Sequence, residues 1–375
     1  MWKDAPFYVK SAISGVLLTL LIYGAIMARQ FLIPFTISVF FTFLLLPLSQ
    51  AMEKIRIPRA LAIILSLLAA AAVFGALIYF FVMQVDIFIG EWPELKEQLN
   101  EKWTTIQKYI NSEFNITRRQ QSRWINEKVQ ETIHDGDLYA MGFFNATGTF
   151  LAGLLLIPIY IFFLTYYRDK FKAFIRLLVK DDPEKILDII RRISTVSQKY
   201  LKGLLLDVLI LSVLNSTGFL ILGLRHAILF GVLASLLNII PYVGVLIGSI
   251  LPVLMALLTE DSLSVAIGVA FVAWFVQLLD NNLITPNVVG SSVSINPFAA
   301  FLALIISALI WGVPGMVLCI PLTGMIKVVC DQIESLKPYG FMLGEETRFQ
   351  ARKARTEQFW NKLKQSKARR SAKPS

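Results

Sequence analysis

Charged side chains are rare inside the apolar stretches of this sequence, so the carboxylates found there are candidates for chemistry. Asp207 lies five residues after Lys202, near the start of one apolar stretch, and Asp280 ends another and opens the run Asp280-Asn281-Asn282. Ionisable groups at membrane depth usually mark the path of a substrate or an ion. Clustered carboxylate and amide oxygens suit a hard cation or a hydroxylated solute. Two simpler roles stay open, since Asp207 could lie at the membrane interface and Asp280 could cap local structure.

Backbone polar groups could complete such a path, because two apolar stretches contain strong helix breakers. Residues 227–258 would form a straight helix of about 48 Å, against a hydrocarbon core of about 30 Å, and they contain Pro241-Tyr242-Val243-Gly244. Residues 298–329 contain Trp311-Gly312-Val313-Pro314-Gly315. Proline removes a backbone donor and glycine tolerates a reversed backbone. Each stretch is therefore predicted to form two half-helices whose free N–H and C=O groups can meet a ligand.

A site between the two breaks would be lined by a small set of polar and aromatic residues. These are Asn238, one turn before the first break, Tyr242 inside it, and Asn296, Pro297 and Trp311 near the second. The alternative is that Asn238 caps freed backbone and that the proline and glycine residues only kink helices.

Composition places these residues in a membrane protein. Of the 375 residues, 56% are hydrophobic and 17% are charged, against about 25% charged residues in soluble domains. The apolar residues form eight blocks near or above the spanning length of about 18 residues, at 11–28, 31–48, 60–83, 147–166, 203–224, 227–258, 264–279 and 298–329. The fold class is therefore an all-α polytopic membrane protein. Its net charge of +10 indicates cytoplasmic loops and tails and gives no reason to expect nucleic-acid binding.

Two topologies fit these blocks. In the favoured one, about six helices span the membrane and the two broken stretches form re-entrant hairpins, so that two units of one span and one hairpin enter from opposite sides as an inverted repeat. In the alternative, eight helices span it. The two differ at Glu260 and Asp261, which lie outside in the first and inside in the second. Both keep the basic C-terminal tail inside.

Five regions follow along the chain. The regions are three N-terminal transmembrane segments (1–83), an amphipathic helical extracytoplasmic insertion (84–146), a fourth segment with a cytoplasmic amphipathic helix (147–202), a transport core with two broken-helix repeats (203–329), and a basic cytoplasmic tail attracted to anionic lipid (330–375). The cytoplasmic amphipathic helix is predicted to begin with Asp182 as its N-cap and Pro183 as its first residue. This helix would lie along the inner membrane surface or dock against the core.

Sequence motifs exclude several classes of function. The chain contains no His-Glu-x-x-His run, no Gly-x-Ser-x-Gly elbow and no Gly-x-x-x-x-Gly-Lys-Ser/Thr loop. Its cysteines, Cys319 and Cys330, lack metal-site spacing. We therefore expect neither an enzyme nor a self-contained ATP-driven pump, and no metal or cofactor apart from a coupling ion, either a proton or sodium.

Three motifs resemble the autoinducer-2 exporter family of bacterial membrane proteins. They are Ile240-Pro241-Tyr242-Val243-Gly244, then Asp280-Asn281-Asn282-Leu283-Ile284-Thr285-Pro286-Asn287-Val288-Val289-Gly290 with Ile295-Asn296-Pro297, and finally Trp311-Gly312 with Gly315 and Ile320-Pro321. The motifs keep this order, and the large polar insertion before the fourth segment is also similar to the family. The resemblance implies a permease of the bacterial cytoplasmic (inner) membrane, associated in some members with signal-molecule export and in others with sodium/proton exchange.

These observations together predict a multi-pass secondary transporter with both termini in the cytoplasm, which exports a small polar solute such as a signalling molecule by alternating access. The alternatives are a sodium/proton antiporter and a non-transporting scaffold. Expected partners are the lipid bilayer and a small polar solute or monovalent cation, with a possible homo-oligomer built on the N-terminal segments. The candidate path residues are Asp207, Asn238, Pro241, Tyr242, Gly244, Asp280, Asn281, Asn282, Pro286, Asn296, Pro297, Trp311, Gly312 and Pro314.

Overall fold

The computed structural model describes residues 6–91, 93–94, 97–98, 155–179, 182–260, 262–289 and 295–345. Most residues in these ranges are helical, and the β-type pairing found there is an isolated antiparallel bridge between Ile295 and Gly344. Most of the expected extracytoplasmic insertion and the basic tail beyond residue 345 lie outside the described residues, as does the start of the fourth apolar block.

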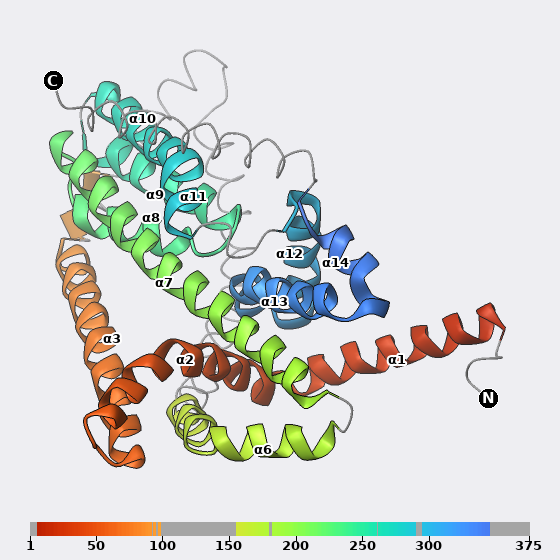
Figure 1. Cartoon of the computed structure of the whole chain (residues 1–375). Helices are drawn as coiled ribbons and strands as arrows, with labels where there is room; N and C mark the ends of the chain where they lie inside the picture. Colours follow the sequence, from red (N-terminus) through yellow and green to blue (C-terminus); the bar gives the residue numbers. More distant parts are fainter. Residues whose placement is uncertain are drawn as a thin grey trace, which may run out of the picture.

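The helices follow the apolar blocks of the sequence (Figure 1). In chain order they are α1 (Phe7–Met27), α2 (Arg29–Lys54), α3 (Arg59–Gly90), an apolar segment at Leu155–Tyr166, α6 (Arg168–Leu178), α7 (Pro183–Ile221), α8 (Ala227–Leu237), α9 (Val243–Thr259), α10 (Leu263–Leu279), α11 (Thr285–Val288), α12 (Pro297–Trp311), α13 (Val313–Gln332) and α14 (Lys337–Leu343). A π-helical turn, Asp280–Ile284, joins α10 to α11, and a 3₁₀ turn, Glu334–Leu336, precedes α14.

The all-α polytopic fold class is confirmed. Within the described residues, five helices are long and apolar enough to cross a membrane, namely α2, α3, α7, α13 and the continuous helix from Leu263 to Val288. Their outward side chains are apolar, as in Leu68, Ile78, Leu209 and Ile267, whose exposed fractions exceed one half. Apolar side chains in such positions suit contact with lipid chains rather than with water.

Helix α7 begins as the sequence predicts but runs further. The side chain of Asp182 accepts a hydrogen bond from the backbone N–H of Lys185, and Pro183 occupies the first helical position. The helix then continues for 39 residues, so the amphipathic segment and the following span are one element. Leu187 and Ile189 are buried and α7 packs on α2 and α13, which means that this segment docks against the core.

Both long apolar blocks break at the predicted positions. The first divides into α8 and α9, and the second into α12 and α13, with the halves of each pair packed against one another. Tyr242 and Gly312, which stand at the two breaks, both have φ of 63°. A side chain at Gly244 would overlap the carbonyl of Leu237, so only glycine allows the two halves of the first hairpin to approach this closely. At 11 residues, α8 is about 16 Å long, far short of the hydrocarbon core.

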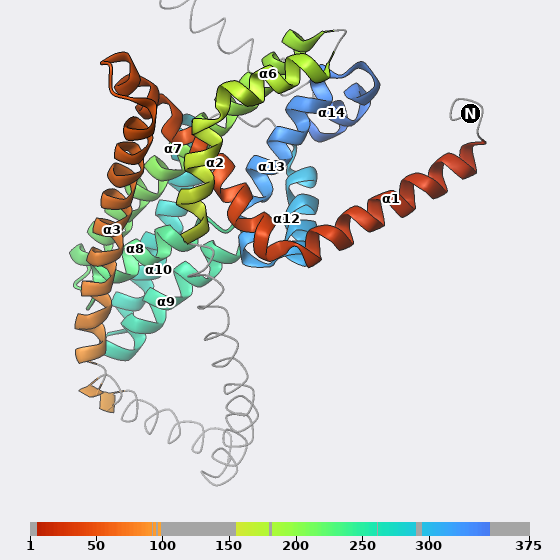
Figure 2. The same ribbon diagram turned by 90° about the horizontal axis from the view of Figure 1, so that it is seen from below.

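Ion pairs tie the helix ends together on two sides of the molecule. On one side Arg168 bonds to Glu53, and Arg59 bonds to Asp169. The hydrogen bond from Arg59 holds the pKa of Asp169 below its ordinary value of 3.8. On the other side, Arg225 Nε lies 2.7 Å from Glu91 Oε2. Figure 2 shows α6 and α14 at the first side and the far ends of α3 and α9 at the second.

Helix α1 extends away from the body of the molecule (Figures 1 and 2). Among the described helices, it packs mainly on α2 and α12. By contrast α7, α8, α9 and α10 form a compact bundle around an apolar cluster. Its fully buried members include Phe219, Ala256 and Val269. The bundle is therefore the rigid frame in which polar groups can be positioned.

Candidate functional site

Asp207 and Asp280, the two carboxylates singled out in the sequence, meet inside the bundle. Asp207 projects from α7, and Asp280 opens the π-helical turn after α10. Their carboxyl groups lie close enough to influence one another electrostatically, and the two residues are only 5% and 3% exposed. Oδ1 of Asp207 is buried and has no hydrogen-bond partner among the described residues. An unfilled buried acceptor beside a second carboxyl group is a place where a proton or cation can bind.

Asp280 is held by three side-chain donors. Asn238 Nδ2 donates to its Oδ2 over 3.0 Å, Gln277 Nε2 to the same oxygen over 3.2 Å, and Thr285 Oγ1 to Oδ1 over 2.6 Å. All three donors are uncharged, and neither Asp280 nor Asp207 forms an ion pair with a lysine or arginine in the described ranges. The protein therefore orients the carboxyl pair without neutralising it.

The π-helical turn explains how Asp280 faces α7. Pro286 has no N–H to donate to the carbonyl four residues earlier, and a wider turn relieves the clash that proline creates in a helix. Asn282 and Asn287 support this segment, because each side-chain amide donates to the carbonyl four residues before it, in Leu278 and Leu283. The sequence analysis treated Asp280 as the end of a span followed by a polar run. That interpretation was wrong about the backbone, which remains helical to Val288.

A glycine allows the two acidic helices to approach. A Cβ atom at Gly203 would lie 2.7 Å from Cα of Val289 and 2.8 Å from the carbonyl oxygen of Val288. Gly203 lies one helical turn before Asp207 on the same face of α7. The backbone contact made possible at Gly203 therefore brings the chain beyond Asp280 against α7 and sets the spacing of the two carboxyl groups.

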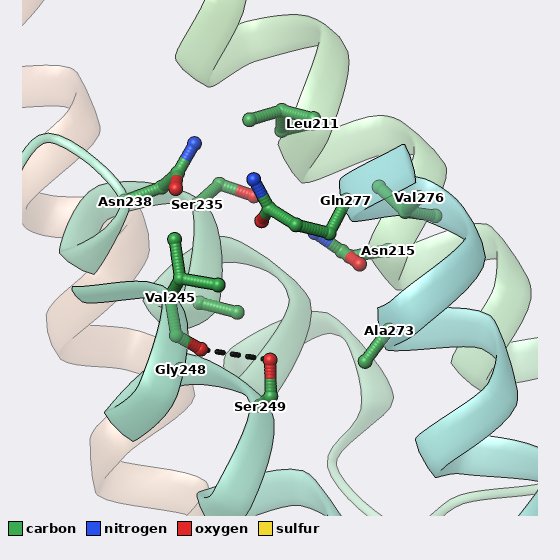
Figure 3. A pocket seen from close by; sticks show the side chains of 11 residues that line it. Leu211, Asn215, Ser235, Asn238, Val245, Gly248, Ser249, Ala273, Val276 and Gln277 are labelled. Atoms are coloured by element: carbon green, nitrogen blue, oxygen red, sulfur yellow. Dashed lines mark hydrogen bonds between the residues drawn. The ribbon is translucent and has the colours of Figure 1, made fainter. Parts of the chain in front are cut away.

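A small polar cavity of about 20 Å³ lies between the helices of the bundle (Figure 3), enough for about one water molecule. Its polar lining comes from all four helices of the bundle and consists of Asn215, Ser235, Asn238, Ser249 and Gln277. Asn215 Nδ2 donates to Ser235 Oγ over 3.4 Å. Asn238 and Gln277 line the cavity and also bind Asp280, so the cavity and the carboxyl pair form one connected polar site.

The other residues proposed from the first break are close to this site but play mainly structural parts. Pro241, Tyr242 and Gly244 form the turn of the first hairpin, directly after Asn238. The ring of Tyr242 makes an edge contact with Phe301 of α12, with 6.2 Å between ring centres. This contact joins the first hairpin to the second.

The residues proposed around the second hairpin lie apart from the carboxyl pair. Asn296 caps α12 by accepting from Ala299 N over 2.8 Å, and its Nδ2 donates to the carbonyls of Met342 and Gly344. Trp311 Nε1 donates to the carbonyl of Ala25 in α1. The remaining residues have positions set by the helix ends: Pro297 and Pro314 lie in first turns, Gly312 separates α12 from α13, and Asn281 accepts from Gln277. The structure thus does not bring Asn296, Pro297 and Trp311 into one site with Asn238.

Several residues of the site were missed in the sequence, namely Gln277, Thr285, Asn215, Ser235 and Ser249. All are uncharged polar residues within or next to apolar helices, where serine and threonine commonly bond to the carbonyl four residues earlier. Ser235 and Ser249 do so. Spacing was the available signal, because Gln277 and Thr285 lie one turn before and somewhat more than one turn after Asp280.

Comparison with known proteins places this arrangement in a family. The model of a family described as AI-2E family transporter matches residues 16–335. The chain belongs to this family. The match includes the carboxyl pair, both hairpins and all the candidate path residues, and it confirms the resemblance drawn from the three sequence motifs.

Relatives of the AI-2E family chain come from several bacteria. The "AI-2 transport protein TqsA" of Escherichia coli is 25% identical over 334 residues, covering 84% of this chain and 90% of the relative. The "Putative transport protein YrrI" of Bacillus subtilis is 25% identical over 312 residues, covering 80% and 86%. A similarly named protein of Haemophilus influenzae is 25% identical over 340 residues, covering 88% and 94%. This chain is thus a transporter-family membrane protein over nearly its whole length.

Proposed function

We propose that this protein is a secondary transporter whose coupling ion binds at Asp207 and Asp280. The observation that carries the proposal is the closeness of two buried carboxyl groups, on residues that are 5% and 3% exposed and that belong to two membrane-crossing helices. Membership of a transporter family supports the general class. The carboxyl pair supports ion coupling, because buried carboxylates in membrane helices mark ion pathways. The sequence also contains no phosphate-binding loop of the kind that ATP-driven pumps use.

Charge balance is the physical basis of the coupling. Removing an ion from water costs several kcal/mol even after the protein relaxes, and two adjacent negative charges add repulsion. The pair is therefore stable when it holds a proton or a monovalent cation, because the side chains that donate to Asp280 are uncharged. Binding and release of the ion change the charge between α7 and α10. That change is a force able to move one helix relative to the other.

The cargo is proposed to be a small polar solute exported from the cytoplasm. The name of the TqsA relative refers to transport of AI-2, and a related signalling molecule is the first substrate to test here. Sodium/proton antiport is the second candidate, because a carboxyl pair that takes either ion in turn needs no further solute. In both cases the chain acts without a tightly bound cofactor.

We place the protein in the bacterial inner membrane with both termini in the cytoplasm. Arg56, Arg59, Arg168, Lys170 and Lys172 gather at the end of the molecule where α6 lies. Positive loops favour the cytoplasmic side. On this orientation the Glu91–Arg225 pair marks the extracytoplasmic end, and the first hairpin enters the membrane from there.

Flux through proteoliposomes tests the proposal. Labelled autoinducer-2 uptake would be measured with a proton gradient, with a sodium gradient and with neither, and a pH-sensitive dye would report proton movement after sodium pulses. We expect one gradient to accelerate solute or ion movement. The double variant Asp207→Asn/Asp280→Asn should lose the acceleration, while Asp188→Asn, an exposed acid on the same helix α7, should keep it. Gradient-dependent flux that survives the double variant would refute coupling at the pair.

A further inference from the structure

On α10, the residues that line the polar cavity all precede Asp280, namely Ala273, Val276 and Gln277. The cavity begins at Asn238 and Gln277, the two amides that bind Asp280. From there its lining continues to Ser249 of α9 and Ala273 of α10. Ala273 precedes Asp280 by seven residues, which is about 10 Å along a helix. The end of α9 and the start of α10 lie on the side of the molecule where α3 ends (Figure 2), so Ala273 lies between Gln277 and that side.

An apolar cluster closes the cavity on the same side. Ala273 belongs to both the cavity lining and the cluster. Beyond it lie Phe219, Val269, Met255 and Phe230, which are 0%, 0%, 5% and 7% exposed. A polar cavity retains water because its walls offer hydrogen bonds, whereas an apolar layer of this kind stays dry. An ion leaving the cavity toward this side would therefore have to cross the dry layer.

We propose that the cavity lined by Asn215, Ser235 and Ser249 is the extracytoplasmic half of the coupling-ion path, and that the apolar cluster is the gate that closes it. The inference rests on the proposed function for the ion's role at the pair. Its ligands are water and a proton or monovalent cation, because a volume of about 20 Å³ is far below the 300 Å³ or more of organic-ligand pockets. In this conformation the cavity is therefore too small to admit the exported solute.

Two buried serines give a matched test of access. Ser235 and Ser66 are each 1% exposed, and each donates to the carbonyl four residues earlier, over 2.8 and 2.7 Å. Ser235 lines the cavity, whereas Ser66 of α3 contacts the sulfur of Met52 in α2. Single Ser235→Cys and Ser66→Cys variants would be made in a background with Cys319 and Cys330 replaced by alanine. Silver ion, a monovalent cation that binds thiolates, would be applied to one side of oriented vesicles.

The readout is the fraction of thiol left for a maleimide after quenching and denaturation. Cysteine reactivity follows access as well as acidity, so we expect Ser235→Cys to react at least about tenfold faster than Ser66→Cys from the extracytoplasmic side. Ser249→Cys, on the neighbouring helix, should react similarly and stands in if Ser235→Cys does not fold. Adding Val269→Ala, which thins the gate, should raise the rate for the cavity cysteines and leave Ser66→Cys unchanged.

Equal rates for Ser235→Cys and Ser66→Cys, or reaction of Ser235→Cys from the cytoplasmic side alone, would overturn the inference. The measurement does not use transport. Failure here with intact gradient coupling at the carboxyl pair would place the ion path elsewhere. Reaction of the cavity cysteines in a protein without gradient coupling would keep the path and reject the proposed coupling.

Discussion

Replacing Asp280 by asparagine separates its two possible roles. The amide keeps the shape of the carboxylate, and if its NH₂ group faces Thr285, that hydroxyl can accept a hydrogen bond instead of donating one. The other oxygen still accepts from Asn238 and Gln277. Hydrogen bonds to a charged acceptor contribute about 1 kcal/mol more than neutral ones. For two bonds the difference is about 2 kcal/mol, small enough for the variant to fold in a domain of ordinary stability.

The two roles predict different transport defects. If Asp280 carries the coupling proton, Asp280→Asn abolishes gradient-driven flux in proteoliposomes and leaves exchange down a solute gradient partly intact, because an amide cannot titrate. If Asp280 binds a cation, the apparent affinity for that cation falls, because a neutral amide oxygen replaces a charged ligand. Asp207→Asn should show the same type of defect, and the double variant should be no worse than the stronger single one, because both carboxyl groups act on one ion.

The assay needs equal amounts of correctly folded protein, checked by size-exclusion chromatography in detergent, with Asp188→Asn as the control acid on α7. Wild-type rates and unchanged gradient dependence in Asp280→Asn would refute the reasoning. In that case the carboxyl pair would be a structural contact between α7 and α10.

Three further predictions concern topology and stability. In a cysteine-free background, a cysteine at Glu260 should label from the same side as one at Glu97 if the first hairpin is re-entrant, and labelling from the opposite side would support eight spans. Gly203→Ala should lower the thermal unfolding temperature in detergent, by an overpacking cost of about 1–3 kcal/mol, because its Cβ would meet the backbone of α11. Gly75→Ala, where no atom lies within 4 Å, should be neutral or slightly stabilising. Because the pKa of Asp169 is lowered in the folded protein, its ion pair stabilises the fold at pH values above the ordinary pKa of aspartate. This stabilisation is lost as the pH falls through the lower pKa of the folded state. Below about pH 4, the unfolding temperature of Asp169→Asn should therefore fall less steeply with pH than that of the wild-type protein. An identical fall in both proteins would count against the ion pair.

The hairpin breaks and helix starts were predictable because their causes are local. Proline lacks an N–H wherever it stands, and a 32-residue apolar stretch exceeds the membrane whatever surrounds it. The same holds for the N-cap of α7 at Asp182, which accepts from the backbone N–H of Lys185 only three residues away. These features depend on the chain's own backbone geometry, so residue order alone indicates them.

The backbone at Asp280 shows where local rules stop. An Asp-Asn-Asn run is typical of turns, because short polar side chains compete for backbone hydrogen bonds. Here Asn282 and Asn287 bond to carbonyls of the preceding turn and the helix continues. Whether such side chains break a helix or support it depends on the packing around them, which the sequence does not display.

The residue types were determined by the sequence, whereas the tertiary structure decided which of them meet. Asn238 reaches Asp280 across 42 positions, while Trp311 instead finds Ala25 and Asn296 finds the end of α14. The physical reason is that partners far apart in the chain are chosen by helix packing. The backbone contact at Gly203 decides the distance between α7 and α11, and therefore makes Asp207 and Asp280 a pair rather than two isolated acids.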